Sequence, residues 1–182
     1  WEHPESLLVF SEGNNDHTKN MTVMAPSTAK SVLSVGGTDN GNLTPRPQEN
    51  AYLKSSAGPT SDNRIKPSIT APAKPLWCVD GATTDQYKLM EGTSMAAPAA
   101  AGTLGLVRQY IKEGWYPLGL KRPANGFNAS AALLKAIAMN SADDMTGTDA
   151  TLPIPNNVEG WGRMDIDNTL FFNGDTKTWR IM

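Results

Sequence analysis

The sequence predicts an α/β fold in which a parallel sheet is flanked by helices, and three stretches carry that prediction. A short apolar run, residues 7–10, ends in turn-forming residues, which is typical of a buried central strand whose carboxyl end opens into a loop. Residues 32–37 alternate, contain β-branched residues and close on two glycines, which indicates a second strand. A long stretch of small and apolar residues from Ser94 indicates a helix.

Two helices are expected. The first begins at Ser94, and its apolar positions cover most of the helix surface, which predicts a buried central helix. Pro98 is expected in its first turn, where the missing N–H costs little, and Gly114 is expected to end it. The second helix spans residues 130–140, with Ser130 as its N-cap. Residues 72–85 show no clear pattern and are assigned to a loop.

Composition and charge describe an ordinary globular protein. Hydrophobic residues make up 39% of the 182 residues and charged residues 19%, and the formal net charge is −2. Because the charge is neither strongly basic nor clustered, no nucleic acid and no membrane surface is expected as a partner. The apolar runs are too short for a transmembrane helix. Cys78 is the only cysteine, so no disulfide can form within the chain.

One motif carries specific chemistry. Residues 92–98 read Gly-Thr-Ser-Met-Ala-Ala-Pro and lead into the first helix, so the free N–H groups of its first turn can face a developing negative charge. Ser94 is therefore the candidate nucleophile. An isolated Gly-x-Ser is more often a helix N-cap, which is the alternative interpretation. The α/β-hydrolase elbow needs glycine at Ala96 and the β-lactamase motif needs lysine at Ala97, so neither fits.

These seven residues resemble the nucleophile motif of the subtilisin-like serine proteases (subtilases, peptidase family S8). Residues 55–59 and 64–72 are also similar to subtilase segments in the same order, although Ser68 replaces an aspartate. The resemblance covers the C-terminal half of a catalytic domain, residues 1–170. It implies a subtilisin-like parallel sheet with the nucleophile at the start of a buried central helix. Residues 171–182 would begin a following segment or β-sandwich, as in bacterial alkaline subtilases, and the protein would be secreted, that is, extracellular.

The resemblance also implies an oxyanion hole. Subtilases end the matching strand in Ala-Ala-Gly-Asn, and residues 11–14 read Ser-Glu-Gly-Asn. Asn14 would donate its side-chain amide to the oxyanion, with the Ser94 backbone N–H as the second donor. Outside this context, Gly-Asn would simply be a turn.

A substrate pocket follows from the same alignment. Four residues would bind the substrate side chain that precedes the scissile bond, with the first three on one wall and the last near the base: Ser11, Glu12, Gly13 and Met24. Glu12 is expected to be a solvated carboxylate. The bulk of Met24 suggests a shallow pocket, and the bond between Ala25 and Pro26 is a candidate for a cis peptide.

The sequence contains neither of the subtilase motifs that carry the general base and its orienting carboxylate. A serine hydroxyl needs a base and an orienting group, which subtilases supply as Asp and His from the first half of the domain. The two histidines here are His3, near Pro4, and His17, which is expected to be a solvated loop residue. A half sheet would also leave an edge open to water, so an N-terminal half or a companion chain carrying the Asp and His is expected as a partner.

Two functions remain open at this point. The first is a serine endopeptidase that cleaves peptide or protein substrates through an acyl-enzyme on Ser94, with the isolated chain inactive. The second is a catalytically silent subtilase-like module that binds peptide or protein. No cofactor is required and no local cluster indicates a metal. Subtilases commonly bind structural calcium through Asp side chains and loop carbonyls, so a structural calcium is possible by resemblance. Asp16, Asp39 and Asp62 are scattered along the sequence and are expected to be solvated carboxylates.

Overall fold

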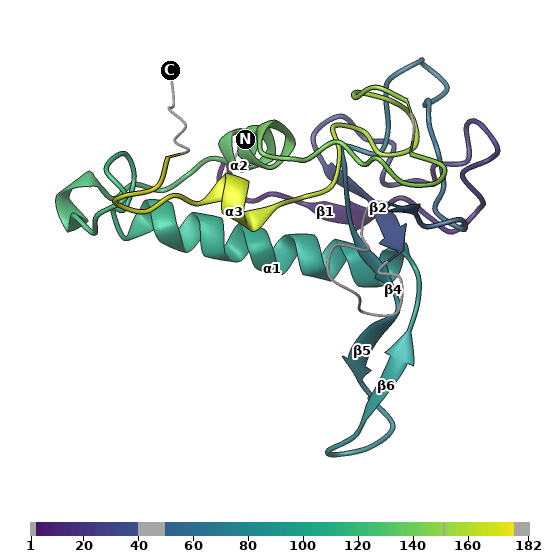
Figure 1. Ribbon diagram of the computed structural model, residues 1–182, viewed down its shortest axis with the longest axis horizontal. Coiled ribbons are helices and arrows are strands. Elements are labelled where there is room, and N and C mark those ends of the chain that lie inside the picture. The colour runs from purple at the N-terminus through teal and green to yellow at the C-terminus, as the bar shows by residue number, and fades with distance from the viewer. Residues whose placement is uncertain (1–2, 40–49, 151, 177–182) are drawn as a thin grey trace.

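The computed structural model describes residues 3–39, 50–150 and 152–176. Its elements in chain order are β1 (Val9–Ser11), β2 (Leu33–Asp39), β3 (Asn50–Ala51), β4 (Ile69–Lys74), β5 (Leu76–Val79), β6 (Tyr87–Met90), α1 (Thr93–Lys112), the 3-10 helix η2 (Pro123–Asn125), α2 (Ala131–Asn140) and α3 (Ile166–Thr169). In Figure 1 one end of α1 lies below strands β1 and β2, and α2 and α3 lie above the middle of the same helix. The predicted α/β class is confirmed.

The sheet is built around β2. This strand pairs in parallel with β1 and with β4, and its end pairs antiparallel with β3. Residues 33–38 are all buried, as expected for a strand covered on both faces. In the described part of the chain, residues 7–10 do not form the buried central strand that was predicted, because β1 lies at an edge of the sheet. Within the described residues β1 pairs on one side only, so it is half-buried, and Leu8 is 57% exposed.

One face of α1 forms the core with the sheet. Residues 100, 104, 107 and 111 recur at helical spacing and are buried in one cluster with side chains of β2 and β4. The opposite face is exposed, with Leu106 50% exposed, so within the described chain the helix is buried on one side rather than all round.

Pro98 lies in the second turn of α1, not the first, and leaves the Ser94 carbonyl without its i+4 donor. The helix ends before Gly114, whose φ of 79° confirms the expected stop.

The C-terminal part of the chain packs back on α1. Ser130 caps α2 by accepting a hydrogen bond from the Leu133 N–H at 3.1 Å, as predicted. The Tyr110 hydroxyl donates to the Phe171 carbonyl at 2.5 Å, and the Phe172 ring meets the Trp115 ring edge-on. Contacts of this fold therefore continue past residue 170. Residues 171–182 were expected to begin a following segment or a β-sandwich, and of these residues 177–182 lie outside the described residues. The β-sandwich stays a prediction.

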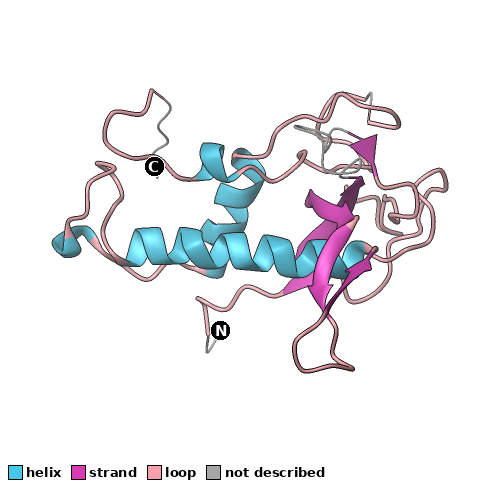
Figure 2. Ribbon diagram, turned by 60° about the horizontal axis from the view of Figure 1, so that its bottom comes forward, coloured by secondary structure: helices cyan, strands magenta, loops and turns pink. Residues whose placement is uncertain are grey.

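A hairpin replaces the expected loop at residues 72–85. Strands β5 and β6 pair antiparallel, with Trp77 opposite Leu89 and Val79 opposite Tyr87. These four side chains are each more than half exposed, and the hairpin projects from the body of the molecule (Figures 1 and 2). Strand β6 ends three residues before α1 begins.

Of the helices that the structure describes, none combines the length and the apolar character needed to cross a membrane.

Candidate active site

Ser94 is exposed at the amino end of α1. It is the second residue of the helix, and the preceding Gly92 adopts a φ of 138°, which favours glycine. The Gly92 N–H donates to the Ala73 carbonyl at 3.0 Å, which ties the entry of the helix to the end of β4. The Ser94 N–H belongs to the first turn, whose N–H groups have no acceptor within the helix. It is therefore positioned as a hydrogen-bond donor beside its own hydroxyl group.

Asn14 meets the same turn from the end of β1. Its Oδ1 accepts hydrogen bonds from the Thr93 N–H at 2.9 Å and from the Thr93 hydroxyl at 3.0 Å. These contacts occupy the oxygen and leave the amide Nδ2 as the free donor. A Cβ added to Gly92 would lie 3.3 Å from this Nδ2, so the amide group sits directly against the residue before the helix. The structure thus brings together Asn14 and Ser94, which are 80 positions apart in the sequence.

Thr93 holds Asn14 beside the start of α1, a role that the sequence analysis does not predict. Its side chain is fully buried, and its hydroxyl lies 3.3 Å from the Gly13 nitrogen and 3.2 Å from the Gly13 oxygen. A second support comes from Ser56, whose N–H donates to the Gly13 carbonyl at 3.0 Å and whose hydroxyl accepts from the Asn15 N–H at 3.1 Å. The only sequence signal for Thr93 was its place directly before the candidate nucleophile.

A pocket of about 390 Å³ opens beside Ser94 and Asn14. Three of the four predicted pocket residues line it, namely Ser11, Gly13 and Met24. Met24 is 53% exposed and covers Gly13, because its Cγ and Sδ lie 2.9 and 3.0 Å from the place a Gly13 Cβ would take. The peptide bond before Pro26, another lining residue, is cis, as predicted. A substrate-binding role for these residues stays a prediction.

Glu12 differs from its prediction, because its side chain is buried rather than solvated. It is 0% exposed and does not line the pocket. Its Oε1 accepts a hydrogen bond from the Ser55 hydroxyl at 2.7 Å, while Oε2 has no hydrogen-bond partner within the described structure. Burial raises the pKa of Glu12 well above its usual value, and the hydrogen bond from Ser55 and the charge of Lys66 only partly offset this. Sequence spacing does not indicate this burial, because Ser55 and Lys66 are more than 40 positions away from Glu12.

The two histidines are engaged elsewhere. His17 is buried, not solvated as expected, because its Nδ1 lies 3.1 Å from the Tyr52 carbonyl oxygen and its Nε2 lies 3.8 Å from the Asp149 carboxylate. His3 is exposed and lies 3.8 Å from the Glu5 carboxylate. Neither histidine lines the pocket that holds Ser94. The described residues therefore place no imidazole beside the candidate nucleophile.

The acidic residues considered for calcium make local contacts. The Asp16 carboxylate accepts from the N–H and the hydroxyl of Thr18, and the Asp62 carboxylate accepts from Arg64 and from Thr60. Asp39 lies 3.8 Å from the Lys74 ammonium. In the described part of the chain, His, Cys, Asp and Glu side chains form no group of three or more that could hold a metal ion. A structural calcium stays a prediction.

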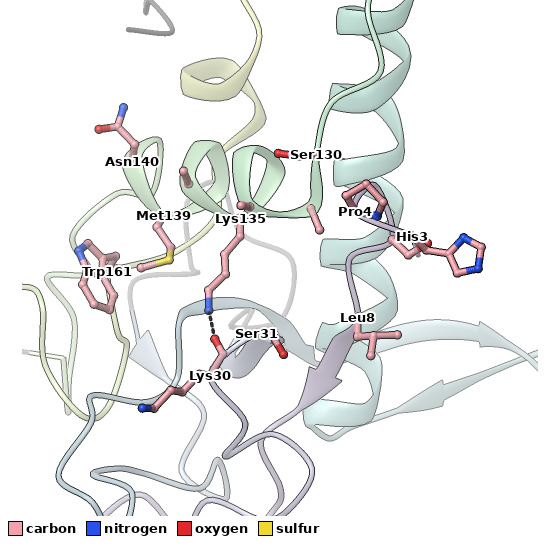
Figure 3. Close-up of a pocket in the computed structure, with 14 residues that line it drawn as sticks. His3, Pro4, Leu8, Lys30, Ser31, Ser130, Lys135, Met139, Asn140 and Trp161 are labelled. Carbon is pink, nitrogen blue, oxygen red and sulfur yellow. Dashed lines mark hydrogen bonds between the residues drawn. The ribbon is translucent and has the colours of Figure 1, made fainter. Parts of the chain in front are cut away.

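A larger cavity, of about 830 Å³, lies away from this site between α2 and the segment that precedes β1. Figure 3 shows Lys135 reaching from α2 toward residues 30–31, where its ammonium donates to the Lys30 carbonyl at 3.0 Å. Leu8, Met139 and Trp161 add apolar surface to the same cavity. Neither Ser94 nor Asn14 borders it, so this cavity is not where the candidate nucleophile acts.

Comparison with known protein families identifies the family of this chain. The model of the subtilase family (peptidase S8) matches residues 1–162, nearly the whole chain. The chain belongs to the subtilase family. One curated relative of this subtilase is the "Serine protease/ABC transporter B family protein tagB" of Dictyostelium discoideum, 32% identical over 152 residues, which cover 68% of this chain and 8% of that protein. "Serine protease AprX" of Bacillus subtilis (strain 168) is 30% identical over 115 residues, 57% of this chain and 26% of that protein.

Solved structures place this subtilase in the same fold. The structure titled "Structure of Prenylagaramide maturation protease PagA" superposes with a TM-score of 0.66 at 21% identity, over 91% of this chain and 50% of that chain. The one titled "Sphericase" gives a TM-score of 0.62 at 20% identity, over 85% and 46%. The chain thus spans about half of these protease structures and less than a tenth of the Dictyostelium protein. The subtilisin-like fold is confirmed for a partial domain.

Proposed function

We propose that this chain is the nucleophile-bearing part of a serine endopeptidase. The observation that carries the proposal is the pair of hydrogen bonds from Thr93 to Asn14 Oδ1, which leaves the Asn14 amide free beside the residue that leads into Ser94. A carbonyl oxygen lodged there would meet the Asn14 Nδ2–H and the Ser94 N–H. Such fixed donors stabilise the negative charge that develops on a carbonyl oxygen under attack.

The reaction then follows from acyl-transfer chemistry. The Ser94 Oγ attacks the peptide carbonyl carbon and its proton passes to a general base. As the tetrahedral intermediate collapses, the C–N bond breaks and the base returns the proton to the leaving amine. Water, activated by the same base, attacks the ester on Ser94 and releases the acid product. Peptide or protein is therefore the proposed substrate, and Ser11, Gly13 and Met24 the proposed contacts for its acyl side.

The general base and its orienting carboxylate are proposed to come from an N-terminal portion or a companion chain. Two observations support this proposal. Among the described residues the outer edge of β1 has no strand partner, and the face of α1 that turns away from the core carries Leu106 in the open. A Cβ added to Gly102 or Gly105 would meet nothing within 4 Å, so this face has room for a closely packed element.

The proposal is tested on the protein purified in its native assembly. Native mass measurement should reveal a covalent extension or a second polypeptide that contains an Asp and a His, and the assembly should hydrolyse a denatured protein substrate. An assembly with no such partner and no hydrolysis would contradict the proposal. Binding of unfolded peptide by that inactive protein would then favour the silent binding module.

Removing the Thr93 hydroxyl should weaken catalysis through Asn14. We expect Thr93→Val to lower kcat about tenfold with little change in KM, because roughly one net hydrogen bond that orients Asn14 is lost. The matched control is Thr103→Val, on the same helix, whose hydroxyl donates to the Ala99 carbonyl and to no other group among the described residues. Steady-state kinetics of the native assembly measure both variants. Equal kcat for Thr93→Val and the wild type would show that the hydroxyl does not position Asn14.

A further inference from the structure

A carboxyl group lies buried beneath the loop that holds Asn14. Glu12 is the residue between the pocket residues Ser11 and Gly13, and its backbone connects β2 to the pocket residue Met24. Its N–H donates to the Val35 carbonyl at 3.1 Å, and its carbonyl accepts from the Met24 N–H at 2.9 Å. The side chain crosses β2 at Gly36, where an added Cβ would lie only 2.6 Å from the Glu12 Oε1. The absence of a side chain at residue 36 thus makes room for this carboxyl group.

Ser55 and Ser56 connect the carboxyl group to the residues around Asn14. The Ser55 hydroxyl donates to Glu12 Oε1 at 2.7 Å and accepts from the Gly37 N–H at 2.9 Å. The next residue, Ser56, holds the Gly13 carbonyl and the Asn15 N–H, on either side of Asn14. A shift of the carboxyl group would therefore reach residues 13–15, here called the oxyanion loop, through two adjacent serines.

We propose that Glu12 is a positioning residue of this protease, and that its protonated carboxyl group holds the oxyanion loop in place through Ser55 and Ser56. The inference rests on the proposed peptidase function. Subtilases have alanine at this point of the motif, so the device belongs to this chain rather than to the general pattern of the family.

The surroundings of the carboxyl group favour its neutral form. Only Ser55 bonds it among the described residues, and an ionised carboxylate that is fully buried needs more partners than one hydroxyl. The charged group that faces it is Lys66, which is also buried and whose ammonium donates to the Ala29 carbonyl at 3.0 Å. Burial lowers the pKa of Lys66 to about 8. Its positive charge therefore fades as the solution becomes alkaline and would compensate an ionised Glu12 less and less.

The direction of the pH dependence follows. Because the pKa of Glu12 is raised by burial, the group stays protonated where an ordinary glutamate has already ionised. The Ser55 hydroxyl can donate to either form of the carboxyl group, but the buried position is stable only while the group is neutral. The positioning role is therefore present at low pH and weakens as the pH rises through the raised pKa, because a buried carboxylate with one hydrogen bond is drawn toward water. The wild-type kcat should therefore carry an alkaline decline that belongs to Glu12, separate from the acid-side limb of the general base.

The test compares Glu12→Gln, Glu12→Ala and the exposed control Glu5→Gln in the native assembly, with kcat and KM measured from about pH 5 to about pH 9. Gln keeps the oxygen that accepts from Ser55 but cannot ionise, so Glu12→Gln should retain the low-pH kcat and lose the alkaline decline. Glu12→Ala should lower kcat about tenfold throughout, with KM nearly unchanged. Glu5→Gln should follow the wild type. A Glu12→Gln profile that superimposes on that of the wild type would overturn the proposal.

A second readout works without activity. If the wild-type assembly does not hydrolyse peptides, the proposed function fails, and Glu12 is then judged by amide hydrogen exchange at Gly13 and Asn15, corrected for the intrinsic effect of pH. Protection should fall with rising pH in the wild type and persist in Glu12→Gln. Identical protection in the two proteins across this range would disprove the positioning role independently of catalysis.

Discussion

Peptide hydrolysis by the native assembly is expected to fall by about 10⁶ in kcat when Ser94 is replaced by alanine, the loss established for the corresponding serine of subtilisin, a member of the same family. The reason is chemical, because without the Ser94 Oγ no acyl-enzyme can form. Hydrolysis of a peptide substrate, compared under identical conditions, measures the loss. Because Ser94 is exposed, the change should leave the fold intact.

The control for this variant is Ser61→Ala, at another exposed serine that does not line the pocket. It should keep wild-type kcat and KM. Thermal unfolding of all three proteins separates a chemical loss from a loss of fold. A Ser94→Ala variant that retains substantial hydrolysis would show that another group is the nucleophile, and the acyl-enzyme on Ser94 would have to be abandoned.

Asn14→Asp should lower kcat by about 10² to 10³ while KM changes little, the range known for removal of the matching donor in subtilisin. Aspartate keeps the oxygen that accepts from Thr93 and so preserves the local hydrogen bonds. It removes the amide donor and places a negative charge where the oxyanion develops. The loss therefore falls on the transition state rather than on substrate binding.

Asn20→Asp makes the same chemical change at an exposed position outside the pocket and should leave the kinetics unchanged. Steady-state kinetics with one peptide substrate give kcat and KM for both variants. If Asn14→Asp raised KM and left kcat as it is, Asn14 would be a ground-state contact and the oxyanion role would be wrong.

Features governed by local chemistry could be predicted from the sequence. The helix that starts at the Gly-Thr-Ser motif, the Ser130 cap and the stop before Gly114 all follow from residues next to each other in the chain. The meeting of Asn14 and Ser94 also agrees with the structure, but there the resemblance to subtilases supplied the pairing.

Features governed by distant residues could not be predicted. Glu12 is buried because Ser55 comes over it, and His17 is buried because the Tyr52 carbonyl and Asp149 enclose it. The β5–β6 hairpin could not be predicted, because the apolar side chains on one of its faces are exposed instead of packing on the core. Strand β5, which contains Trp77 and Cys78, lies within the residues that the sequence analysis assigned to a loop. Burial of a charged side chain depends on contacts that sequence spacing does not encode.

The most direct test of the proposed nucleophile is labelling of the native assembly with a fluorophosphonate, which reacts with activated serines, followed by peptide mapping of the modified residue. We expect a single label on Ser94, lost after denaturation and absent from Ser94→Ala. No label on the native wild type, or a label on a different serine, would contradict it.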